Sequence, residues 1–350
     1  MLRPWPEVTA ATAVTWTSSP ARTTIERAPN CLGPFLIAAR VTGSKLSQVQ
    51  DEIGAVVDLL SHPGFLTGLG IGLVAAAFLL GAKVSTGRSP DGWGLAFASA
   101  VALGVFIRFD VDPSTYLFVG GLALVGMAGD AIIERDDEPS GAFGLFGYWV
   151  AALVLAFGLV FILEVGEVEW APFFLPLVIA GSGVGIWLLG RSDVAEVVGP
   201  MVAISVAGMW ITVPETDMIT VLVGAAIPFG LVTLRPLRAR AWVAGSLALS
   251  GMMAWLVFFE GIQREWTIAA AWATLATLPV LGIFVRIRPR SYNMYLVLGI
   301  HLVYVVMITR VADITDSTIA VAAATLVLCV SAGVLAFLLA RLYEPVGVSS

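Results

Sequence analysis

The 350-residue sequence has little of the chemistry that metal sites and disulfides need: two cysteines and two histidines. Cys31 lies in the amino-terminal tail and Cys329 inside an apolar block, so the pattern predicts no disulfide framework and no thiolate cluster. His62 and His301 stand far apart in the chain, and two histidines do not supply the usual ligands of a metalloenzyme. The sequence therefore predicts no metal and no cofactor.

Motifs for nucleotides and for activated nucleophiles are also missing. Gly68-Leu69-Gly70-Ile71-Gly72 lies inside an apolar run and is no dinucleotide fingerprint, and no P-loop occurs. No serine stands in a nucleophile-elbow pattern, and few acids or histidines are available to activate one. The sequence favours a non-enzymatic role and predicts no nucleic-acid partner. A lipid-modifying enzyme that uses the basic loops is a weaker alternative, because it lacks a nucleophile or general base.

Charge is scarce throughout the chain. Only 13% of the residues are charged, 58% are hydrophobic, and the mean hydropathy is +0.92. Soluble domains do not have this composition. The apolar residues form blocks of about 20 residues, the length that crosses a bilayer as a helix. Because hydrocarbon offers no partner to free backbone groups, we predict an all-α, polytopic integral membrane bundle of about eleven helices.

The predicted spans and domains follow from these blocks. The spans are expected at about 65–82, 92–109, 114–133, 143–163, 170–190, 194–213, 218–234, 241–259, 266–285, 294–312 and 319–341. They form one transmembrane domain over 65–341, with connections too short for a catalytic domain. Residues 1–43 are expected to be a disordered tail or an over-long gene model, 44–61 an amphipathic interfacial helix, and 342–350 a short cytoplasmic tail.

Basic residues gather in alternate loops. One set of loops and the tail after the last span carry Lys83, Arg88, Arg135, Arg191, Arg235, Arg238, Arg240, Arg286, Arg288, Arg290 and Arg341. The other set carries Arg108, Arg264 and Arg310 beside an excess of acids. The positive-inside rule makes the first set cytoplasmic. We therefore predict a multi-pass protein of the cell membrane with its carboxyl terminus in the cytoplasm and its amino terminus outside.

Lysine is nearly absent among the basic residues. Only Lys45 and Lys83 are lysines, although Lys and Arg total 19, and the formal net charge is −6. Arginine preference with an excess of acids indicates a halophilic, GC-rich source.

Glycine, in contrast, is frequent and is spaced for helix packing. Gly64, Gly68 and Gly72 form a doubled G-x-x-x-G ladder at the start of the first span. Small residues at this spacing let two helix backbones approach closely. The ladder indicates tight packing inside one chain or, alternatively, the seam of a homodimer.

Three prolines fall inside predicted spans at similar intervals. Pro176, Pro228 and Pro279 are separated by about 50 residues, and they are expected to kink their helices. One interpretation is a repeated helical hairpin, the internal symmetry found in transporters. The other is that any series of two-span hairpins has this period.

Ionisable groups inside hydrocarbon are costly, so each one is a functional candidate. His301 is central in its span, and Tyr304 and Tyr295 could share its helix face as a polar track. Either it is a neutral imidazole bonded to a neighbouring helix, or it binds a proton or substrate. Asp130 and Glu196 lie near cytoplasmic span ends, where each acid either reaches the interface or serves an ion or proton site.

Two functional hypotheses remain. In the first, the protein is a secondary transporter or permease-like carrier for a small or lipid-like solute. In the second, it is a non-catalytic structural subunit or scaffold of a membrane assembly. The predicted partners are the lipid bilayer and, as alternatives, a second copy of the chain or another membrane protein.

Overall fold

The computed structural model of the protein describes residues 54–86, 93–109, 120–124, 170–213, 217–234, 243–260, 265–287 and 293–342. The chain divides into two compact units, residues 1–55 and 56–350, and every labelled helix below lies in the second. Residues 54–61 are helical, and helical geometry is interrupted at His62. Pro63 accounts for the interruption, because a proline disfavours helical geometry in the residue before it.

Helices account for nearly all the described residues, and no strand occurs among them. The helices are α2 (Pro63–Thr86), α3 (Trp93–Arg108), α6 (Ala171–Gly190), the 3-10 helix η1 (Ala195–Val197), α7 (Val198–Thr212), α8 (Asp217–Val232), α9 (Val243–Glu260), α10 (Glu265–Ala273), α11 (Thr277–Ile287), α12 (Met294–Ile314) and α13 (Thr318–Leu342). The predicted all-α helical bundle is thereby confirmed.

Six helical segments of the described chain are long and apolar enough to cross a membrane. They are Pro63–Ser85, Phe173–Gly190, Ala195–Thr212, Glu265–Ile287, Met294–Ile314 and Thr318–Leu339. Shorter apolar helices in α3, α8 and α9 coincide with further predicted spans. The spans predicted at 114–133 and 143–163 lie outside the described residues, apart from the helical stretch 120–124.

The ninth predicted span coincides with the candidate span Glu265–Ile287, but it is not one continuous helix. Residues 266–285 were expected to form one helix, but α10 ends at Ala273 and α11 begins at Thr277. Pro279 supplies the physical reason, since it has no N–H for the carbonyl of Leu275 and its ring clashes with that carbonyl in a continuous helix. Leu275 O accepts instead from the N–H of Leu278, at 3.1 Å. The proline thus stands in the first turn of a new helix.

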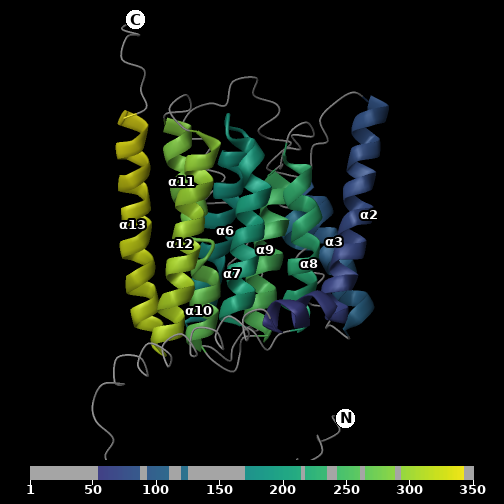
Figure 1. The fold of residues 1–350 in the computed structure, drawn as a ribbon, viewed down its shortest axis with the longest axis horizontal. Coiled ribbons are helices and arrows are strands. Elements are labelled where there is room, and N and C mark those ends of the chain that lie inside the picture. The colour runs from purple at the N-terminus through teal and green to yellow at the C-terminus, as the bar shows by residue number, and fades with distance from the viewer. Residues whose placement is uncertain are drawn as a thin grey trace, which may run out of the picture. The chain divides into compact units, whose positions relative to one another are not determined.

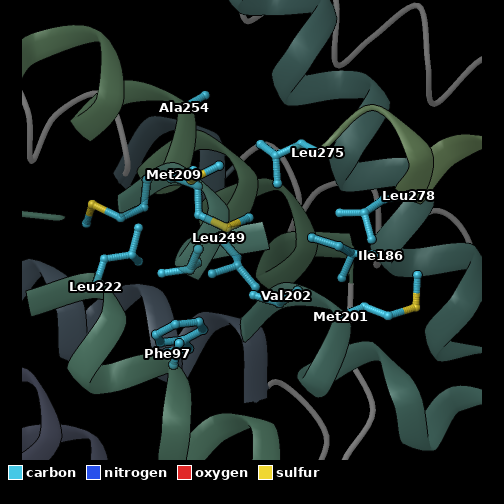
Figure 2. Close-up of a cluster of buried hydrophobic side chains, with 14 of the residues drawn as sticks. Phe97, Ile186, Met201, Val202, Met209, Leu222, Leu249, Ala254, Leu275 and Leu278 are labelled. Carbon is cyan, nitrogen blue, oxygen red and sulfur yellow. The ribbon is translucent and has the colours of Figure 1, made fainter. Parts of the chain in front are cut away.

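Buried apolar side chains of the central helices pack against one another. The helices α2 and α13 lie at opposite edges of the second unit (Figure 1). Exposed apolar side chains such as Phe78 of α2 and Leu326 of α13 line those two edge helices. Figure 2 shows part of the core, in which Met201 of α7, Ile186 of α6 and Leu278 of α11 are all buried. Large exposed apolar faces are what a lipid-facing helix requires.

The glycine ladder of α2 lies against α8 of the same chain. A Cβ at Gly68 would fall 2.8 Å from the carbonyl carbon of Val221, and a Cβ at Gly72 would fall 3.1 Å from Cα of Ala225. Gly224 of α8 returns the contact, because a Cβ there would lie 2.8 Å from the backbone nitrogen of Leu69. The two backbones are therefore in direct contact along the ladder.

Candidate functional site

The break between α10 and α11 frees backbone carbonyls in the middle of an apolar segment. Residues 274–276 form a turn inside the 23-residue candidate span Glu265–Ile287. Its amide groups bond three residues back, from Thr274, Leu275 and Ala276 to the carbonyls of Ala271, Trp272 and Ala273. Irregular backbone at membrane depth is tolerated only where it is buried in protein or lines a cavity. At this break, side chains from neighbouring helices complete the bonding.

His301 of α12 lies against the break and is fully buried. Its Nε2 is 2.9 Å from the carbonyl oxygen of Met201 on α7, and its Nδ1 is 2.7 Å from Oγ1 of Thr277, the first residue of α11. A carbonyl only accepts hydrogen bonds, so Nε2 carries the hydrogen and donates to Met201. In the neutral ring Nδ1 then accepts from the Thr277 hydroxyl. One imidazole therefore joins α12 to α7 and to α11.

Ser205 of α7 ties the same imidazole to the turn. Its hydroxyl donates to the Thr274 carbonyl at 3.1 Å, and its oxygen lies 3.1 Å from Nε2 of His301. Thr274 Oγ1 donates to Ala271 O at 2.7 Å and lies 3.2 Å from the Ser205 carbonyl. Both side chains are fully buried. The turn and the centre of α7 therefore satisfy each other's polar groups.

Tyr304 donates a second hydrogen bond to the carbonyl of Ala273, the last residue of α10, which also accepts from the Ala276 amide. The Tyr304 hydroxyl lies 2.7 Å from Ala273 O, and Sγ of Cys329 on α13 lies 3.6 Å from the Tyr304 hydroxyl oxygen. The polar groups thus run from α7 through the break to α13. We call Ser205, Thr274, Thr277, His301 and Tyr304 the break cluster.

The residues singled out from the sequence fall in different places. His301 and Tyr304 belong to the break cluster, whereas Tyr295 is 70% exposed and lies off it. Glu196 stands in η1 and is 5% exposed, with its carbonyl accepting from Thr233 Oγ1 at 3.2 Å. Asp130 lies outside the described residues.

The three prolines also differ. α6 and α8 continue through Pro176 and Pro228, while Pro279 follows a break. Before Pro279 the segment Glu265–Ile287 is interrupted by the turn at residues 274–276, and the Thr274 carbonyl in that turn accepts from Ser205.

Sequence reasoning missed Ser205, Thr274 and Thr277. Serine and threonine inside an apolar helix usually bond to their own backbone, so their presence alone is no signal. A usable signal was present in the ninth span, where Thr274 and Thr277 stand three residues apart just before Pro279. Hydroxyl groups next to a proline mark the point where a span's freed backbone groups are satisfied again.

The break cluster consists of uncharged hydrogen-bonding groups. Buried polar or charged residues in the described part of the chain are Ser, Thr, His301 and Glu196. That part holds no group of three or more His, Cys, Asp or Glu side chains able to bind a metal ion. The arrangement suits hydrogen-bond exchange or proton binding.

No protein-family model and no curated protein matches the sequence. The class of the protein is therefore defined by its fold and by the break cluster. The protein is an all-α helical bundle with apolar helices long enough to cross a membrane, and one of these segments is broken beside a buried histidine.

Proposed function

We propose that the protein is a membrane carrier for a small or lipid-like solute, and that the break cluster is part of its solute pathway. The observation that supports this most directly is the broken span Glu265–Ile287, whose second half begins at Thr277, the residue that bonds His301. Discontinuous helices near the bilayer midplane are the usual framework of substrate sites in secondary transporters. The cluster has that depth in two helices, because Ser205 is central in α7 and the turn is central in its span.

The bonding also favours movement at this point. The two halves of the broken span are not joined by a continuous helical ladder, so α11 can shift while α10 stays fixed. Its first turn is held by the Thr277 bond to His301, by the backbone bond from Leu278 to Leu275, and by packing of Leu278 and Pro279 on Gly185 of α6. A solute that offers equivalent donors and acceptors can replace the Thr277 bond with little loss of hydrogen bonding.

A structural subunit is the competing function. Its support is that every side chain of the break cluster is buried and hydrogen-bonded, which a static helix-packing role also explains. A carrier must expose the cluster to water in at least one state, whereas a subunit has no such need. Water access at the cluster therefore separates the two.

Two buried serines give a matched test of water access. Ser205 on α7 and Ser250 on α9 are both fully buried, and each donates to a carbonyl of a neighbouring segment, Thr274 O at 3.1 Å and Ile179 O at 2.9 Å. The Ser205→Cys and Ser250→Cys variants are made in a background with Cys31→Ser and Cys329→Ser. Each is reconstituted in liposomes and treated with a membrane-impermeant methanethiosulfonate reagent.

A carrier is expected to show labelling of Ser205→Cys and none of Ser250→Cys. Absence of labelling at both positions would overturn the carrier and support the packed subunit. Equal labelling at both positions would indicate general loosening of the bundle and would also overturn the proposal, because access would not be specific to the break.

A further inference from the structure

We propose that His301 is the proton-binding group of this site, and that its protonation releases the first turn of α11. The inference rests on the proposed carrier function and adds a coupling ion to it. It starts from the two bonds of the imidazole, one to α7 and one to α11.

In the packed state the imidazole is satisfied only when it is neutral. Nε2–H donates to Met201 O, and Nδ1 accepts from the Thr277 hydroxyl. A second proton on Nδ1 turns this acceptor into a donor, so the Thr277 hydroxyl can no longer donate to it. Thr277 must then accept the new bond and send its own hydrogen elsewhere. The carbonyl of Ala273 already accepts from Tyr304 and from the Ala276 amide, so the Thr277 hydrogen would have to share the Thr274 carbonyl with Ser205.

The positive charge of a protonated His301 also favours release of the first turn of α11. A buried imidazolium without a counter-charge is costly, and the cost falls when water reaches it. Thr277 stands at the amino-terminal end of α11, where the helix dipole places partial positive charge, so repulsion also favours separation of α11 from a charged ring. Protonation therefore stabilises the state in which α11 has moved and water has entered. This differential stabilisation is what couples a ligand to a conformational change.

Few other titratable groups on the packed elements reach this place. α7 carries none, and α10 and α11 carry Glu265 and Arg286, both exposed. On α13 Cys329 contacts Tyr304, and η1 carries the buried Glu196. On α12 itself Tyr295, Arg310 and Asp313 are exposed. Among these neighbours Glu196 is the buried acid, and His301 is the group whose bonding changes when a proton binds.

The test follows the labelling rate of Ser205→Cys as a function of pH, from about pH 8 to about pH 5, the range in which a histidine changes charge. Thiol reactivity itself depends on pH, so each rate is divided by that of Ser317→Cys, an exposed position in the turn between α12 and α13. The same measurement is repeated with His301→Gln. A glutamine side chain keeps one donor and one acceptor but takes up no proton in this range.

We expect the normalised rate to rise as the pH falls, with a slope of at most about tenfold per pH unit because one proton is taken up. In His301→Gln the rate is expected to be low and independent of pH. A wild-type rate that does not change with pH, or an equal pH dependence in His301→Gln, would overturn the proton site and leave the carrier standing. No labelling at any pH would overturn both.

A second measurement covers the case in which His301→Gln fails to fold. The chain has two histidines, so in His62→Gln a selectively ¹⁵N-labelled imidazole belongs to His301. Its second nitrogen should become protonated over the same pH range in which the labelling rate rises. An imidazole that stays neutral throughout that rise contradicts the proposal.

Discussion

Both histidines are fixed in the same tautomer, for opposite reasons. At His301 a carbonyl that can only accept lies 2.9 Å from Nε2. At His62 the N–H of Gly64, which can only donate, lies 3.2 Å from Nδ1, so Nδ1 accepts and Nε2–H faces Asp217 Oδ1 at 3.1 Å. The ring nitrogens of a histidine are set by the partner each one meets.

The first prediction concerns these tautomers. When both imidazoles are neutral, ¹⁵N spectra of selectively labelled histidine are expected to show the Nε2–H form for both rings. The Met201 carbonyl can only accept a hydrogen bond, and the Gly64 N–H can only donate one. His62→Gln assigns the two signals. A dominant Nδ1–H form at His301 would show that the Met201 carbonyl is not its partner.

The second prediction compares two threonines on the basis of what each hydroxyl bonds. Thr277→Val leaves the buried Nδ1 of His301 without a donor, and an unsatisfied buried group costs about 1–3 kcal/mol of unfolding free energy. Thr309→Val is the control, because Thr309 Oγ1 donates to Val306 of its own helix at 2.9 Å and its loss orphans no other side chain. Unfolding in mild detergent should show a clearly larger loss for Thr277→Val. Equal losses would indicate that the His301 contact contributes nothing.

Only part of the break cluster could be predicted from the sequence. His301 was found because an ionisable group in an apolar span is conspicuous. Its partners were not found, since the Met201 carbonyl is invisible to any side-chain pattern, and Ser205 lies about a hundred positions away in the chain. The cluster is a product of tertiary packing, which one sequence does not display.

At the scale of helices, the contact between α2 and α8 depends on which glycines face it. Gly68 faces Val221 so closely that a methyl group there would press on backbone atoms 2.8–3.0 Å away, while a Cβ at Gly70 would have nothing within 4 Å. Both glycines lie in the same helix, two residues apart. The face of α2 on which a glycine lies therefore decides whether the contact with α8 requires it, as at Gly68, or leaves room for a side chain, as at Gly70.

The third prediction compares alanine substitutions at Gly68 and Gly70. Gly68→Ala is expected to lower the unfolding free energy by about 1–3 kcal/mol, because overpacking forces the two helices apart. Gly70→Ala is expected to be neutral, or more stable by up to about 1 kcal/mol, because alanine favours helix more than glycine does. Thermal unfolding of the two variants in detergent measures the difference. Similar losses in both would mean that α2 does not lie on α8 through this face.

The helices themselves were largely predictable, and their internal interruption was not. Apolar blocks fixed the positions of α6, α7, α12 and α13 to within a few residues, because a membrane span needs both length and uniform apolarity. The same uniformity hid the turn at residues 274–276, which is as apolar as its surroundings. Pro279 pointed to it, but Pro176 and Pro228 show that a proline inside a span is compatible with a continuous helix.

For the whole molecule, the distribution of charge predicts orientation. The turn between α6 and α7 carries Arg191, whereas the turn between α12 and α13 carries Asp316. Arginine-bearing loops stay on the cytoplasmic side. The two turns are therefore expected on opposite sides of the membrane, with Ser317 outside and Asp193 inside.

The fourth prediction tests this orientation with two exposed positions. In the background with Cys31→Ser and Cys329→Ser, intact cells that express Ser317→Cys should react with a membrane-impermeant maleimide. Cells that express Asp193→Cys should react only after they are permeabilised, because the positive-inside rule predicts that its turn faces the cytoplasm. Reaction of both variants in intact cells would place the two turns on one side and break the predicted alternation of the spans between them. The reverse pattern would keep the alternation and invert the whole molecule, so that protons reach His301 from the opposite compartment.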